Sequence, residues 1–281
     1  MPGAIGTPRE AALADHCRRL VLMKYRIDDF MDTLWQRYRA ADSVLESQGV
    51  DWLEEVAQNP AMNQNPAVRD FFWPLVRNPE FYSLECVNYL TRYALDPWSF
   101  MRHVLPAAAY EGYHRADLVL QDIDPSLVIG GMYYRNYSED LSEDKLEQLN
   151  ESVRESSSGP EHATYLQLGA LPLYIADEGK NRVRAFLKAR KPISAFTTSV
   201  PLPSAGTLIL HEIPRSSAVT IANISTGGSW LLPLPAVTVP LLESYGVEWG
   251  PQFLLDATYT RELERQQRES LVKLVKDYMI P

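Results

Sequence analysis

The sequence has little of what marks secreted and membrane proteins. It holds two cysteines among 281 residues, too few for a disulfide-stapled scaffold and typical of a reducing cytosol. No apolar run approaches the roughly 20 residues of a membrane-spanning helix. The first residues lack the basic-then-apolar pattern of a signal peptide. We therefore expect a cytoplasmic protein without a membrane segment.

Common catalytic signatures and a positive charge are missing as well. The sequence contains no P-loop, HExxH, GxSxG or paired CxxC motif, so the chemistries tied to these motifs are not expected. Its net charge is −9. This charge argues against a dedicated DNA-binding protein, because basic patches supply most of the affinity for DNA.

One basic stretch runs against this balance. Residues 180–191 carry six lysines and arginines and no acid. Arg184, Lys188 and Lys191 fall on one helical face, at spacings that bring side chains together. Two interpretations stay open at this level: the face meets a phosphate, or it is an ordinary solvated helix surface.

Composition and periodicity predict an α+β protein in three units. A hydrophobic share of 46% with 22% charged residues is ordinary for a globular chain. Apolar residues recur at three- and four-residue steps through much of 8–104, which indicates helices, whereas prolines after residue 201 favour strands and turns. An amphipathic pattern predicts a last helix over 256–279. The predicted units are a helical domain (1–112), an α/β domain (113–212) and a β-rich extension that ends in this helix (213–281).

The first half of the predicted α/β domain reads as a strand followed by a helix. Residues 117–123 alternate like a strand and end in an Asp124-Pro125 turn. Residues 142–155 are typical of a helix, with Ser142 as the N-cap and acids in the first turn. The apolar side of this helix is formed by Leu146, Leu149 and Val153.

The second half predicts a β-hairpin that leads into a short helix. Two apolar runs, 164–168 and 171–176, are joined by Gly169-Ala170. The second run stops at residues 177–179, Asp-Glu-Gly, and a helix-compatible segment follows. The predicted order is therefore strand, strand, glycine, helix.

Residues 171–191 are the most informative segment of the chain. A strand that enters a helix through Gly179 gathers backbone N–H groups, the helix dipole and the side chains of Lys180, Asn181 and Arg182, an arrangement that holds phosphates. The alternative is an ordinary β–α connection. In that case Asp177 and Glu178 serve as turn and N-cap residues, and Arg182 pairs with an acid.

Taken in order, four elements of residues 116–200 resemble the ParB/sulfiredoxin superfamily. The family pattern runs from a strand through I-x-P, a loop arginine and a helix reading LxxLxxSIxxxG to a strand ending in DGxxR or GERRxxA. The counterparts in this chain are Ile123-Asp124-Pro125, Arg135, residues 146–155 and residues 179–185. The resemblance implies a ParB/sulfiredoxin-like α/β core within the predicted α+β fold.

The same resemblance implies a phosphate site, although the chain departs from the family at two positions. Gly179, Lys180, Asn181 and Arg182 would hold the phosphates of a nucleotide, and Arg135 would close over it. The glutamate and first arginine with which partition ParB proteins bind and turn over CTP correspond to Lys180 and Asn181. The sulfiredoxin cysteine corresponds to Lys180, and the two histidines of the serine-kinase branch correspond to Lys180 and Asn181.

Three functions are compatible with this pattern. The first is a stand-alone ParB-like nuclease or NTPase, of the kind associated with plasmids, that hydrolyses a phosphodiester or phosphoanhydride bond. Asp177 or Glu178 would then hold a divalent metal or activate water, with ATP or CTP and Mg²⁺ as the expected ligands. The second is a module that binds a nucleotide or nucleic acid without turnover. The third is a small-molecule kinase of the free-serine type.

Further expectations concern partners and pathway. The motif ENxQR and a helix-turn-helix domain, which follow the nucleotide loop in partition ParB proteins, are not found after residue 212, so a role in chromosome segregation is not expected. We expect a protein partner at the helical N-terminal domain or at the C-terminal helix, with a homodimer as one form of that contact.

Overall fold

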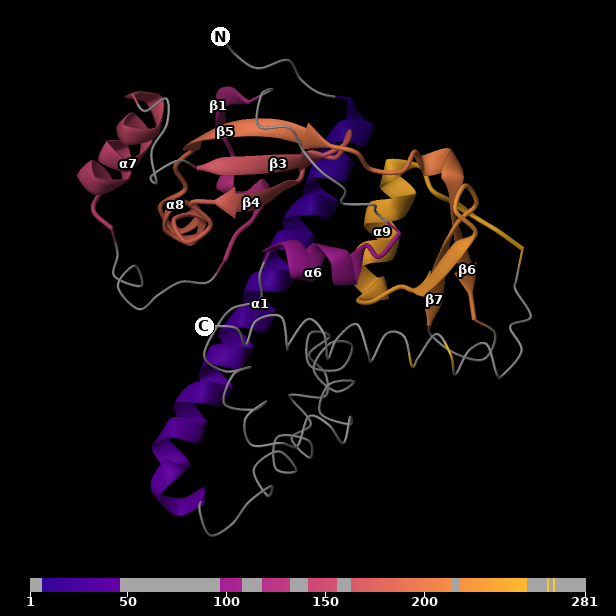
Figure 1. The fold of residues 1–281 in the computed structure, drawn as a ribbon, viewed down its shortest axis with the longest axis horizontal. Helices are drawn as coiled ribbons and strands as arrows, with labels where there is room; N and C mark the ends of the chain where they lie inside the picture. Colours follow the sequence, from indigo (N-terminus) through magenta and orange to yellow (C-terminus); the bar gives the residue numbers. More distant parts are fainter. Residues whose placement is uncertain are drawn as a thin grey trace.

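The fold is α+β, with an N-terminal helix, further helices and two mixed sheets (Figure 1). The computed structural model describes residues 7–45, 97–107, 118–131, 141–155, 163–213 and 218–251, together with residues 262 and 265. Residues 46–96, Arg135 and nearly all of the predicted helix 256–279 lie outside the described residues. Within the described part of the chain, no helix is long and apolar enough to cross a membrane.

Helix α1 (Pro8–Leu45) begins with a reciprocal cap. The Glu10 amide donates to Thr7 Oγ1 at 3.3 Å, and the Thr7 amide donates to Glu10 Oε2 at 2.7 Å, which satisfies two of the amides that a helix start leaves open. Pro8 suits the first helical position because it has no N–H to satisfy. The residues buried along α1 follow the predicted three- and four-residue steps and include Cys17, Leu20, Val21 and Tyr25.

Helix α1 also carries a buried ion pair that the apolar periodicity does not predict. Lys24 Nζ donates to Asp28 Oδ2 at 2.6 Å, and both side chains are 0% exposed. The two residues are four apart, so they lie on one face of the helix. Removing either partner would break this buried charge pair, which makes the two residues interdependent.

The first sheet has the strand order β1-β5-β3-β4-β2. The strands are β1 (Val119–Ile123), β2 (Val128–Ile129), β3 (Thr164–Leu168), β4 (Tyr174–Glu178) and β5 (Ile193–Val200). Strand β3 is antiparallel to β4 and parallel to β5, β1 is antiparallel to β5, and β2 is parallel to β4. The predicted first strand and hairpin are therefore present.

The second strand of the hairpin is displaced from its predicted position. It spans Tyr174–Glu178 rather than residues 171–176, and Leu171 and Leu173 lie in the turn. Both leucines are almost fully buried, and the turn is closed by the Leu168 amide, which donates to the Leu173 carbonyl at 3.0 Å. Their apolar character reflects core packing of a turn, which a pattern based on polarity alone assigns to a strand.

Helices cover both faces of this sheet. On one face α7 (Glu143–Glu155) and α8 (Val183–Ala189) enclose an apolar cluster that includes Leu146, Val153 and Phe186. Leu146 and Val153 belong to the predicted apolar side of α7, and the Lys145 amide donates to Ser142 Oγ at 3.3 Å, as expected for an N-cap. On the other face the sheet packs against α1 and α6 (Pro97–Val104).

A second sheet follows, with the strand order β8-β7-β6-β9. Its strands are β6 (Leu208–Glu212), β7 (Val219–Asn223), β8 (Gly228–Leu231) and β9 (Glu248–Trp249). Because β6 and β7 form an antiparallel pair, the expected domain boundary after residue 212 falls inside a hairpin. The apolar residues of this sheet join those of α1 and the first sheet in one continuous core.

Helix α9 (Pro235–Tyr245) follows the second sheet's strand β8 and lies against α1 (Figure 1). The sequence pattern does not predict this helix, because its prolines favour turns. Pro235 is tolerated at the start of the helix, where its missing N–H has no partner to lose. Pro240 removes one backbone hydrogen bond. The burial of Leu241 and Leu242 in the common core offsets that loss.

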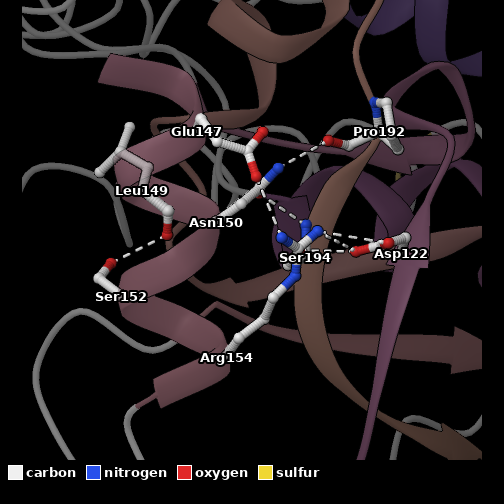
Figure 2. Close-up of polar contacts among 8 residues, drawn as sticks. All are labelled: Asp122, Glu147, Leu149, Asn150, Ser152, Arg154, Pro192 and Ser194. Atoms are coloured by element: carbon white, nitrogen blue, oxygen red, sulfur yellow. Dashed lines mark hydrogen bonds and ion pairs between the residues drawn. The ribbon is translucent and has the colours of Figure 1, made fainter. Parts of the chain in front are cut away.

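A buried asparagine fixes α7 to the first sheet (Figure 2). Asn150 Nδ2 donates to the Pro192 carbonyl at 3.1 Å, and the Ser194 amide donates to Asn150 Oδ1 at 2.8 Å. Ser194 Oγ also donates to Asp122 Oδ1 at 2.6 Å. This hydrogen bond, followed by the Arg154 contact, lowers the pKa of Asp122 below its usual range although burial opposes it.

We predict that replacing Asn150 with Ala lowers the free energy of unfolding by about 2 kcal/mol, because the buried Ser194 amide loses its acceptor. Urea denaturation measures the change. Ser152→Ala is the matched control on the same helix, since Ser152 Oγ donates only to the Leu149 carbonyl one turn earlier. An Asn150→Ala protein as stable as this control would contradict the prediction.

A second prediction concerns His103 on α6. His103 is 3% exposed, and burial lowers its pKa to about 3. An unfolded histidine has a pKa of about 6.5. Between these values the unfolded state binds more protons than the folded state, so stability falls as the pH decreases from about 6.5 toward 3, by up to about 1.4 kcal/mol per pH unit. Urea denaturation of the parent and of His103→Gln at pH 5 and 7 tests this, and identical pH slopes would contradict it.

Candidate functional site

The candidate site lies where two neighbouring parallel strands end. In the register of β2 and β4, Val128 is opposite Tyr174 and Ile129 is opposite Ile175. The carboxyl ends of both strands therefore meet at the same edge of the sheet. Ligands of α/β sheets bind beyond the carboxyl ends of the strands. Both strands continue into glycines at this point.

The turn after β4 has the predicted order of strand, glycine and helix. Gly179 has a φ of +68°, a conformation that side chains other than glycine rarely adopt. The Arg182 amide donates to the Gly179 carbonyl at 3.2 Å, and α8 starts at Val183. A Cβ on Gly179 would lie 3.1 Å from Ala163 Cα and 3.2 Å from Arg182 Nε. The Arg182 side chain therefore folds back against the turn.

The two glycine turns are joined to each other. The Gly131 amide donates to the Lys180 carbonyl at 3.1 Å. A Cβ on Gly130 would lie 2.7 Å from Val183 Cβ and 3.0 Å from that carbonyl oxygen, and a Cβ on Gly131 would lie 3.2 Å from Asn181 Oδ1. The backbone after β2 thus packs directly under residues 180–183. Lys180 and Asn181 are half-buried over this contact.

The two predicted carboxylates have different surroundings. The pairing of β3 with β4 shifts by one residue, with Thr164 opposite Glu178 but Tyr165 opposite Ala176, so Asp177 is the extra residue of a β-bulge. Bulges re-aim side chains, and Asp177 Oδ1 accepts a hydrogen bond from Trp98 Nε1 on α6 at 3.3 Å. Glu178, at the end of β4, is exposed.

A divalent metal remains a prediction for these carboxylates. Among the described residues, no group of three or more His, Cys, Asp or Glu side chains is placed to hold a metal ion. Mg²⁺ in phosphate sites is usually bound by one or two carboxylates, with phosphate oxygens and water completing its shell. Asp177 or Glu178 would fit such a role only together with a bound phosphate.

Two residues of the basic face predicted at 184, 188 and 191 form ion pairs with other parts of the same chain. Arg184 forms an ion pair with Asp29 of α1, and its guanidinium lies 5.6 Å from the centre of the Tyr25 ring. Lys191 Nζ lies 2.9 Å from Glu143 Oε2 of α7. The first contact attaches α8 to α1, and the second attaches the segment after α8 to α7. At Arg184 and Lys191 the structure therefore favours ion pairs within the chain over a contact with phosphate.

Several site residues were not predicted from the sequence. Gly130-Gly131 directly follows a short apolar run, and this order is itself a turn signal. Trp98, Tyr25 and Tyr165 had no local signal, because they reach the site from α6, α1 and β3. Tyr25 is 5% and Tyr165 0% exposed, and burial raises the pKa of each phenol.

Replacing Gly130 with Ala tests the contact between the two turns. The new methyl group would collide with Val183 and with the Lys180 backbone, and we expect a loss of about 1–3 kcal/mol in unfolding free energy. Gly206→Ala is the matched control, because a Cβ there meets nothing within 4 Å. Urea denaturation compares the variants, and equal stability of Gly130→Ala and the control would contradict the packing described above.

Comparison with known proteins found no match. No family model, no curated protein and no solved structure matches the chain.

Proposed function

We propose that the chain binds the phosphate group of a nucleotide or nucleic acid at the turn formed by residues 179–182. The observation that carries this proposal is the pair of glycine turns at the carboxyl ends of β2 and β4, joined by the Gly131–Lys180 hydrogen bond. Such ends are where α/β sheets receive their ligands. Glycines there let a ligand approach the backbone closely.

The order of elements supports a ParB/sulfiredoxin-like core. A strand ends in the Asp124-Pro125 turn, helix α7 follows, and β4 then enters α8 through Gly179. This is the order of the family pattern. Asp124 accepts a hydrogen bond from the Ser126 amide at 2.9 Å, which shapes the turn after β1.

In this proposal each polar residue of the turn has a separate role. Lys180 and Arg182 supply positive charge to the phosphate, Asn181 supplies an amide, and Arg135 closes over the ligand. Charge-assisted hydrogen bonds of this kind are among the stronger polar interactions in proteins. ATP or CTP with Mg²⁺ are the nucleotides to test first.

Hydrolysis is the first form of this function, and binding without turnover is the second. Glu178 is exposed at the end of β4 beside the turn, where a carboxylate can activate water or bind a metal. The hydrogen bond from Trp98 to Asp177 favours the second form, because it engages a carboxylate oxygen that catalysis would need.

Titration calorimetry against ATP, CTP, GTP and a short DNA duplex, with and without Mg²⁺, tests the binding. We expect the parent to bind one of them and Arg182→Ala to bind it about tenfold or more weakly, since a charge-assisted contact is lost. Arg19→Ala is the control of equal charge: Arg19 pairs with Asp15 on the exposed side of α1, so its loss should leave affinity unchanged. No binding by the parent would end the proposal, and unchanged affinity in a destabilised Arg182→Ala would make Arg182 a structural residue.

Release of phosphate or nucleotide with Mg²⁺ or Mn²⁺ separates the two forms. If the site hydrolyses its ligand, Glu178→Gln should abolish turnover while the ligand still binds. Asp177→Asn is a useful companion, because its side-chain carbonyl can still accept the Trp98 hydrogen bond. Full turnover in both variants would clear the two carboxylates, and a parent that binds without turnover would establish the binding form.

A further inference from the structure

Two tyrosine hydroxyls lie in the interior at the glycine turns. Tyr25 reaches there from α1, and a Cβ on Gly130 would lie 2.9 Å from its hydroxyl oxygen. Tyr165 comes from β3, where it pairs with Ala176 of β4. Both hydroxyl oxygens are fully enclosed by protein. Residues 179–182 of the turn after β4 are only half-buried.

Neither hydroxyl group finds a hydrogen-bond acceptor among the described residues, and the two do not bond to each other. Charged groups act on both of them. Burial raises the pKa of Tyr165, whereas the nearby Arg182 guanidinium acts in the opposite direction, which places this cation within electrostatic range of the phenol. Arg184 lies over the ring of Tyr25. The Asp28 carboxylate also acts on Tyr25 and raises its pKa, but it is already paired with Lys24. The two hydroxyls are therefore donors without an acceptor among the described residues.

Such a set is poorly suited to a closed core. A buried hydroxyl without an acceptor carries the cost of its lost hydration, and phenylalanine would fill nearly the same volume without that cost. Buried unsatisfied groups are rare in native proteins, and each calls for an explanation. Two of them beside an arginine, at the carboxyl ends of β2 and β4, are explained by a ligand that brings the acceptor.

We propose that Tyr25, Tyr165 and Arg182 form an inner anion subsite that receives an oxygen of the ligand's terminal phosphate. This inference rests on the proposed function and adds the interior residues that would bind the phosphate. The ligand class is a phosphate monoester or polyphosphate, whose terminal group is small and presents several acceptor oxygens. A phosphodiester, with its phosphate flanked by sugars on both sides, would not reach the subsite.

Single hydroxyl removals test the subsite. Tyr165→Phe and Tyr25→Phe are titrated with inorganic phosphate and with ATP, alongside chloride at equal ionic strength. Loss of a hydrogen bond to a charged oxygen should weaken binding about tenfold or more. The fold should stay intact, because neither hydroxyl loses a protein acceptor. Tyr245→Phe is the matched control. The Tyr245 hydroxyl, at the end of α9, donates to the Pro203 carbonyl at 3.0 Å. Its loss should lower the melting temperature and leave binding unchanged.

The outcomes separate the subsite from the function itself. A parent that binds ATP or phosphate, with Tyr165→Phe and Tyr25→Phe binding equally well, overturns the subsite and leaves the proposed function standing. Binding of the DNA duplex alone, with no affinity for phosphate or ATP, also overturns the subsite. A parent that binds none of these ligands overturns both. Selective weakening in the two Phe variants, with Tyr245→Phe unaffected, is the expected result.

Discussion

Burial of one side of α1 between the two sheets is the interaction on which the rest of the structure depends. Cys17, Leu20 and Val21 share a continuous apolar core with strands of both sheets, and burial of apolar area is the main favourable term in folding. Polar contacts then fix the position of the helix. Arg9 Nη2 donates to the Tyr245 carbonyl at the end of α9, at 3.2 Å, and Arg18 Nε donates to Ser126 Oγ after β1, at 3.1 Å.

This arrangement ties the candidate site to the N-terminal helix. Tyr25 lies under Gly130, and Asp29 holds Arg184 on α8, so α1 contacts both the turn after β2 and the helix after β4. The site therefore does not belong to the α/β sheet alone. Substitutions in the apolar side of α1 would alter the alignment of the two glycine turns even though they contact no ligand.

The sequence predicted what depends on local spacing and missed what depends on distant contacts. The cap and apolar side of α7, the β3–β4 hairpin and the glycine turn before α8 follow from neighbouring residues. Helix α9 was missed because burial in a distant core outweighs the local effect of Pro240. At the site, Trp98 and Tyr25 were missed because residues far apart in the chain meet there, and no periodicity records such a meeting.

The hydrogen bonds of Asn150 also fix the alignment of β5 with its neighbouring strands. Strand β5 is buried on both sides at Ile193, Ser194 and Ala195, so it lacks the alternation of polar and apolar residues that normally sets the alignment of a strand with its neighbours. Asn150 binds the carbonyl of Pro192 and the amide of Ser194. A slip of one residue would break both bonds at once. Through Asn150, α7 therefore disfavours a sheet in which β5 is shifted along its neighbours. Burial of the apolar residues of β5 alone would not distinguish the two alignments.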